Sequence, residues 1–203
     1  MSAAGDVVFR PRFGRVLTVG TGLLSVAALV SAAVSDPVAA LRLLPGLKLV
    51  AVAVWAVFGM PAVVVNDGGV VIRNVWRTIE LPWPSIQQID TKYALTLVTA
   101  YGVFAAWAAP APSRVQAMSA GRDALAHLPE SRYAMGGVRP GDLLGTPSGD
   151  AASYVRRRWE ELRDAGHLDD PRLEQARPST RWHLATIVST AALAALTIVA
   201  LNV

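Results

Sequence analysis

The chain has 203 residues, of which 53% are hydrophobic and only 17% are charged, and its net charge is +4. Soluble domains carry about 25% charged residues and disordered chains are richer still in charge, so this composition excludes a disordered chain and argues against a purely soluble globule. The absence of cysteine excludes disulfides, thiolate nucleophiles, thiolate zinc sites and iron–sulfur clusters. We therefore expect a small domain attached to membrane-spanning segments.

The positive charge does not indicate nucleic-acid binding. Residues 60–181 hold 14 basic and 13 acidic residues, and the excess lies at the N-terminus, where Arg10, Arg12 and Arg15 face only Asp6. A nucleic-acid-binding protein gathers its basic residues on the folded domain. Basic residues that flank an apolar run follow the positive-inside pattern instead, so we expect a lipid bilayer as partner and no nucleic acid.

The first apolar run covers residues 16–34 and contains no charge. As a helix with a rise of about 1.5 Å per residue, it just crosses a hydrocarbon core of about 30 Å. The basic flank and Ser31-Ala32-Ala33 also resemble a signal peptide with its cleavage site, but this run is longer than the usual apolar segment of a signal peptide. We expect a membrane helix that is kept, with cleavage as the alternative.

The second apolar run follows the short connection at residues 35–37 and covers residues 43–59, where a proline at position 61 favours the end of the helix. Lys48 lies one to two turns from the start of this run, so we expect its stem to carry the ammonium group to the interface. A functional role inside the membrane is the alternative. Residues 16–59 are thus predicted to form a transmembrane helical hairpin.

The third apolar run covers residues 182–203. An aromatic and basic anchor lies at its start and consists of Arg177, Arg181, Trp182 and His183. With basic residues before the first and third runs, the predicted topology is that of a multi-pass plasma-membrane protein. Its N-terminus (residues 1–15) and its central domain are cytoplasmic, and its C-terminus is outside.

Between the hairpin and the third run, residues 60–114 predict a small antiparallel sheet. Short β-branched or alternating runs are separated by turn signals such as Asn66-Asp67-Gly68-Gly69, which is typical of a meander or small barrel. About 50 residues make a small core, so we expect a later helix or the membrane to complete it. The six predicted strands cover residues 61–66, 70–73, 77–81, 86–92, 94–99 and 103–107.

The chain after the sheet is predicted to be a loose connector (115–147, with a short helix at 121–128), an amphipathic helix (148–166) and a polar linker (167–181). Val155, Trp159 and Leu162 recur at helical spacing, Thr146 or Ser148 can cap the helix, and Gly166 is a natural stop. Arg157 and Glu161 are placed as an i,i+4 pair. The basic triplet at 156–158 is consistent with a solvated face or with binding of anionic lipid.

The sequence contains none of the motifs for phosphate loops, dinucleotide-binding loops, zinc proteases or serine hydrolases. The three histidines lie far apart, and Asp67, Glu80 and Asp90 are of the kind that strand ends and turns routinely carry. We therefore predict no catalytic residue, no metal and no cofactor.

Four motifs in order resemble the actinobacterial membrane-anchored PH-domain-containing proteins of the low molecular weight protein antigen 6-like group. This resemblance implies a small PH-like antiparallel β split barrel on the cytoplasmic face. With the apolar runs and the helical spacing described above, the predicted fold class is an α+β membrane protein with an N-terminal transmembrane helical hairpin, this split barrel, an amphipathic helix and a C-terminal transmembrane helix. It implies no established activity and no catalytic residue. The motifs are residues 61–65 with the Asp67-Gly68 turn, Arg73-Asn74 with Arg77-Thr78, Pro82-Trp83 with Ile86, and residues 106–112.

The predicted function is a non-catalytic module that binds a protein partner or the lipid surface. The alternative is an accessory subunit of an envelope-lipid enzyme or transporter, in which Lys48 and Arg42 would matter. The predicted lipid- or partner-contact residues are Arg73, Arg77, Lys92, Trp83, Arg156 and Arg157.

Overall fold

The computed structural model describes residues 6–112, 140–168 and 176–202, so the short helix predicted at 121–128 lies outside the described residues. The chain divides into two compact units. The first unit comprises Met1–Arg10, Ala62–Asn74 and Thr78–Thr180. The second comprises Pro11–Pro61, Val75–Arg77 and Arg181–Val203.

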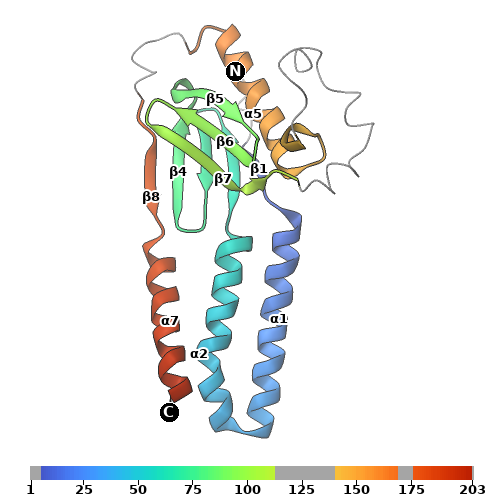
Figure 1. Cartoon of the computed structure of the whole chain (residues 1–203), viewed down its shortest axis with the longest axis vertical. Coiled ribbons are helices and arrows are strands. Elements are labelled where there is room, and N and C mark those ends of the chain that lie inside the picture. The colour runs from blue at the N-terminus through green and yellow to red at the C-terminus, as the bar shows by residue number, and fades with distance from the viewer. Residues whose placement is uncertain (1–5, 113–139, 169–175, 203) are drawn as a thin grey trace. The chain divides into compact units, whose positions relative to one another are not determined.

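Two antiparallel sheets form a PH-like β-sandwich, as the predicted fold class requires (Figure 1). The five-stranded sheet has the order β1 (Val7–Phe9), β2 (Ala62–Asn66), β3 (Gly69–Arg73), β4 (Arg77–Pro82) and β8 (Ser179–Trp182). The three-stranded sheet has the order β5 (Ile86–Asp90), β6 (Ala94–Thr99) and β7 (Gly102–Pro110). A short 3₁₀-helix, η2 (Trp83–Ser85), joins β4 to β5.

The core of the sandwich follows from the alternation along the strands. Val63 pairs with Ile72 and Ile72 with Ile79, and all three side chains are fully buried. On β6, Leu95 and Leu97 are buried in the same way. Side chains two positions apart share one face of a strand, so these residues form one continuous apolar layer.

Helix α5 (Pro147–Asp164) completes this core. It places the small side chains of Ala151 and Ala152, together with Val155, against the sheets, where all three are fully buried. The hydroxyl of Thr146 accepts a hydrogen bond from the Gly149 backbone amide and so caps the helix. The expected need for a later helix is met by α5.

Helix α5 also protects an edge of the sandwich. The Trp159 indole donates to the Ile86 carbonyl (3.1 Å), and Arg156 donates to the Ile89 carbonyl (3.3 Å). Both carbonyls belong to β5, the edge strand of the three-stranded sheet. Unpaired edges invite association with other chains, and these two bonds help to satisfy this one.

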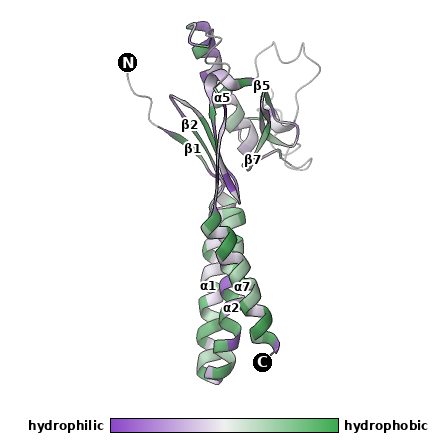
Figure 2. Ribbon diagram, turned by 90° about the vertical axis from the view of Figure 1, so that its left-hand side faces the viewer, coloured by the Kyte–Doolittle hydropathy of each residue, from purple (hydrophilic) through white to green (hydrophobic). Residues whose placement is uncertain are grey.

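Apart from Val75–Arg77 and the residues just before α7, the second unit consists of apolar helices. Helix α2 packs against both α1 and α7, and the three helices are coloured largely as hydrophobic in Figure 2. In the part of the chain that the structure describes, three helices are long and apolar enough to cross a membrane, as the sequence predicted. The elements are α1 (Arg12–Ser35), α2 (Pro37–Val54) with its π-helical continuation η1 (Trp55–Gly59), and α7 (Leu184–Asn202).

Two strands were not predicted. The N-terminal segment 1–15, expected to be a basic tail, contains β1, which pairs with β2, and the segment 167–181, expected to be a linker, contains most of β8. Each strand has only three or four residues, too few for an alternation to stand out. With them, every apolar helix is joined by one or two residues to a strand of the five-stranded sheet: α1 to β1, η1 to β2 and α7 to β8.

Candidate interaction surfaces

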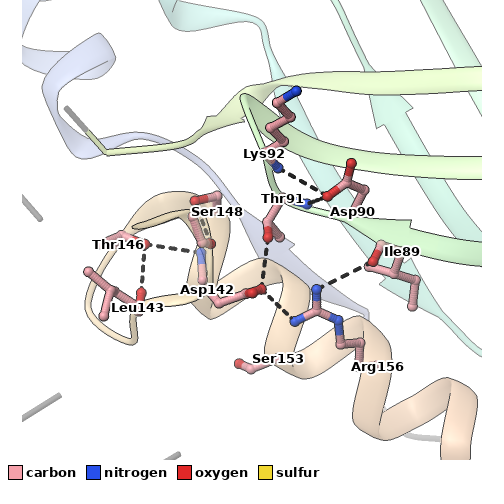
Figure 3. A network of polar contacts seen from close by, with 12 residues as sticks. Ile89, Asp90, Thr91, Lys92, Asp142, Leu143, Thr146, Ser148, Ser153 and Arg156 are labelled. Carbon is pink, nitrogen blue, oxygen red and sulfur yellow. Dashed lines mark hydrogen bonds and ion pairs between the residues drawn. The ribbon is translucent and has the colours of Figure 1, made fainter. Parts of the chain in front are cut away.

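A polar network holds α5 on the β5–β6 turn (Figure 3). The carboxylate of Asp142, in the 3₁₀-helix η4 (Pro140–Asp142), accepts from the Thr91 hydroxyl (2.8 Å) and from the Arg156 guanidinium (2.7 Å). The Asp142 and Arg156 side chains are only 12% and 20% exposed. Arg156 was predicted to contact lipid or a partner. In the structure its guanidinium is engaged within the domain, by this ion pair and by the hydrogen bond to the Ile89 carbonyl.

Trp83 is likewise a structural residue. Its side chain is 2% exposed, and its indole donates to the Asn66 carbonyl (2.9 Å), which ties η2 to the turn after β2. The side-chain oxygen of Asn66 itself accepts from the amides of Gly68 and Gly69 (both 3.0 Å). The large Trp83 ring, one of the predicted lipid- or partner-contact groups, thus fills the core of the sandwich in this structure.

The remaining predicted basic residues of the first unit, Arg73, Lys92 and Arg157, are exposed. Lys92 lies over the Tyr93 ring (5.0 Å) and Arg157 over the Tyr154 ring (5.2 Å). None of the contacts found among the described residues joins any two of the three, so these contacts build no common anion site.

The expected pairing on the surface of α5 also differs. Arg157 was placed with Glu161, but it is Arg158 that contacts Glu161 (3.2 Å) and also Asp67 (3.0 Å). The contact with Asp67 connects α5 to the β2–β3 turn, 91 positions away in the sequence. Helical spacing alone could not decide which arginine turns toward the sheet.

Arg77, the last predicted contact residue, belongs to the second unit. Its guanidinium lies over the Trp182 ring (5.8 Å), at the end of β8. The His183 backbone amide donates to the Trp76 carbonyl (2.9 Å), and the His183 Nδ1 atom lies 3.2 Å from the Val75 carbonyl. The β3–β4 turn thus joins the predicted aromatic and basic anchor at the start of α7.

An apolar strip on β7 was not predicted. Val103 and Trp107 are 65% and 58% exposed, and Ala105 between them is also exposed, whereas Phe104 and Ala106 contact the core. A strand in which both faces carry apolar residues gives no alternating pattern. The strip is a surface on which apolar side chains of a binding partner could pack.

The edge of β7 is tied to the other sheet by Asn74, at the end of β3. The Asn74 side-chain amide donates to the Ala105 carbonyl (2.9 Å), and its side-chain oxygen accepts from the Trp107 backbone amide (2.9 Å). These two bonds imitate the pairing of a neighbouring strand. The outward residues of β7 are therefore held on an ordered strand.

Lys48 does not lie where the sequence placed it. Helix α2 begins at Pro37 because the Asp36 carboxylate accepts from the amides of Val38 (2.8 Å) and Ala39 (3.2 Å) and caps it there. The candidate span runs from Pro37 to Gly59, and Lys48 is its central residue. The expectation that Lys48 lies near the start of the helix is wrong.

Within the described residues, no group of three or more histidine, cysteine or acidic side chains could hold a metal ion. The three acids considered above have separate contacts: Asp67 with Arg158, Glu80 with the Ser179 hydroxyl (3.2 Å), and Asp90 with the backbone amides of residues 91 and 92. Each of these three carboxylates is thus engaged by other groups of the protein.

Comparison with known protein families agrees with this architecture. Residues 60–158 match the family described as "Bacterial PH domain". The match covers β2 to β7 and most of α5, whereas β1, β8 and most of the apolar helical residues lie outside it. No curated protein and no solved structure matches the chain.

Proposed function

We propose that this protein is anchored in the plasma membrane and presents its PH-like domain on the cytoplasmic side as a non-catalytic interaction module. The observation that carries the proposal is the direct connection of all three apolar helices to one sheet. Connectors of one or two residues require each helix to enter the bilayer from the side on which the sheet lies. Arg10, Arg12 and Arg15 support the cytoplasm as that side, because basic residues that flank a membrane helix favour the cytoplasmic face.

The same connection supports an N-terminal helix that is kept. Strand β1 precedes α1 and pairs with β2 through residues 7–9 and 63–65. Cleavage after Ala33 would remove β1 from the sheet and leave β2 with an open edge. We therefore propose three membrane spans with the C-terminus outside.

Labelling of introduced cysteines tests this topology, because the chain has none of its own. The variants Gln87→Cys, Ser35→Cys and Asn202→Cys place single thiols at exposed positions in the domain, in the hairpin connection and near the C-terminus. With a membrane-impermeant maleimide on intact cells, we expect labelling at positions 35 and 202 and none at 87 until the cells are lysed. Labelling at 87 in intact cells would contradict the proposal.

The surface that we propose for a partner protein is the β7 strip of Val103, Ala105 and Trp107, because it is apolar, exposed and ordered. A photo-crosslinking amino acid at position 107 of the full chain, expressed in its host, tests this use. We expect a discrete protein adduct at position 107 and none at the exposed control position Glu160 on α5. Adducts with lipid only would instead assign the surface to the membrane, and equal adducts at both positions would refute a specific surface.

The second candidate function, an accessory subunit of a membrane enzyme or transporter, is favoured by one observation: the central position of Lys48 in α2. Ionisable residues inside a membrane segment are costly and commonly mark functional contacts. We also propose, from the motifs quoted above, that the chain is related to the actinobacterial membrane-anchored group.

A further inference from the structure

Lys48 lies too deep in its helix to reach the membrane surface. It is eleven residues from Pro37 and eleven from Gly59, the two ends of the candidate span. At about 1.5 Å per residue this is about 16 Å from either end, and the middle of a hydrocarbon core is about 15 Å from each face. A four-carbon stem is much shorter than this distance, so the ammonium group stays inside the hydrocarbon region.

The structure places Lys48 on an uncovered face of α2. A Cβ atom added at Gly46 would lie 3.4 Å from Thr197 of α7, so the Gly46 side of α2 faces α7. Lys48, two residues further on, is turned by about 200° and points away from that contact. Leu41 and Trp55, each seven residues from Lys48 and so on the same stripe, are 70% and 45% exposed, and Lys48 is also exposed.

The three candidate spans that the structure describes contain no carboxylate with which Lys48 could pair at that depth. The charged residues of the three candidate spans are Arg15, Arg42 and Lys48, all basic. A second copy of the chain would bring the same three spans and no acid. An unpaired ammonium group in hydrocarbon is unfavourable, whereas an ion pair with an acidic side chain from another helix removes most of the cost.

We propose that the stripe formed by Leu41, Lys48 and Trp55 is the docking site for a transmembrane helix of a different protein, which carries Asp or Glu near the middle of the bilayer. The apolar residues above and below Lys48 pack against that helix, and the ion pair selects it. The proposal rests on α2 crossing the membrane, as the proposed function states, and it specifies the kind of subunit that the accessory role requires.

The test uses the full chain and a designed probe: a single-span helix of Leu and Ala with one Asp at its centre. Association of the two in a bacterial membrane is measured by energy transfer between fused fluorescent proteins. Matched probes carry Leu at the same position, or Asp moved to the end of the span. We expect the central-Asp probe to associate about tenfold more strongly than either control, an increase of about 1.4 kcal/mol.

Variants of the chain make the effect specific. Lys48→Met should lower association of the central-Asp probe to the level of the Leu probe. Arg42 is an exposed basic residue near the N-terminal end of the same helix, and Arg42→Met should leave association of the central-Asp probe unchanged. Lys48→Asp should reverse the preference, so that a probe with a central Lys associates most strongly.

Equal association of the Asp and Leu probes, or no loss with Lys48→Met, would overturn the proposal. Cysteine labelling at Ser35 and Gln87 separates this failure from failure of the proposed function. If the two positions lie on opposite sides of the membrane and the probes still bind equally, only the docking site is wrong. If they lie on the same side, α2 does not cross, and both the topology and the docking site fail.

Discussion

The PH-like sandwich and the three helices use the same apolar residue types in opposite ways. In the sandwich, Val63, Ile72 and Leu97 are fully buried by other parts of the protein. In the helices, Leu24 and Leu201 are 73% and 74% exposed. Apolar area gains about 25 cal/mol per Å² when it leaves water, so the sandwich is stabilised by its own chain, whereas the helices need a bilayer or further helices to cover them.

The largest difference between the two regions should appear when one leucine is truncated in each. Leu97→Ala opens a cavity in the sandwich and should lower the free energy of unfolding by about 2–5 kcal/mol. Leu24→Ala removes a side chain that faces lipid or detergent and should change it by less than about 0.5 kcal/mol. Thermal unfolding of the full chain in detergent, followed by tryptophan fluorescence, measures both. Similar losses for the two variants would contradict the comparison.

Adding a methyl group at a glycine should likewise affect stability differently in the two regions. A Cβ atom at Gly141 would overlap the Thr91 carbonyl oxygen, so Gly141→Ala must displace η4 from the β5–β6 turn and should cost about 1–3 kcal/mol. At Gly20, in α1, an added Cβ meets nothing within 4 Å. Gly20→Ala should therefore be neutral or slightly stabilising in the same thermal assay. A neutral Gly141→Ala would show that this contact is not close in solution.

Arg156 and Arg157 are neighbours on α5, but among the described residues only Arg156 of the two is engaged in an ion pair within the domain. Arg156→Met removes the ion pair with Asp142 and the bond to Ile89 and should cost about 2 kcal/mol. Arg157→Met, on the exposed face, should change stability by less than about 0.5 kcal/mol. Equal effects of the two variants in denaturant titrations of the full chain would refute the structural role of Arg156.

The smallest expected effect concerns the link between the sheets. Asn74→Ala removes both hydrogen bonds to β7 and should cost about 1 kcal/mol. The local effect of the substitution is easier to detect. Hydrogen exchange of the Trp107 backbone amide should become faster, whereas exchange of the backbone amide of Leu97, a fully buried residue of β6, should change only as far as global stability changes. Unchanged protection at Trp107 would show that Asn74 does not hold this edge.

The sequence by itself determined the main elements of both regions. Alternation and turn residues are local signals, so the strands predicted at 61–66, 70–73 and 94–99 coincide closely with β2, β3 and β6, whereas β7 runs three residues beyond the predicted 103–107. The apolar runs predicted the three long helices for the same reason. The resemblance in motif order pointed to the PH family, which the match at residues 60–158 supports.

The tertiary structure alone decided which residues are partners. Strands β1 and β8 form because strands distant in the sequence pair with them. A segment of three or four residues is too short for its sequence pattern to predict such a pairing. Arg156 and Trp83 became structural because Asp142 and Asn66 lie beside them in the fold. These are long-range contacts, and hydrophobic periodicity, which reports only which face of an element is apolar, carries no information about what that face meets.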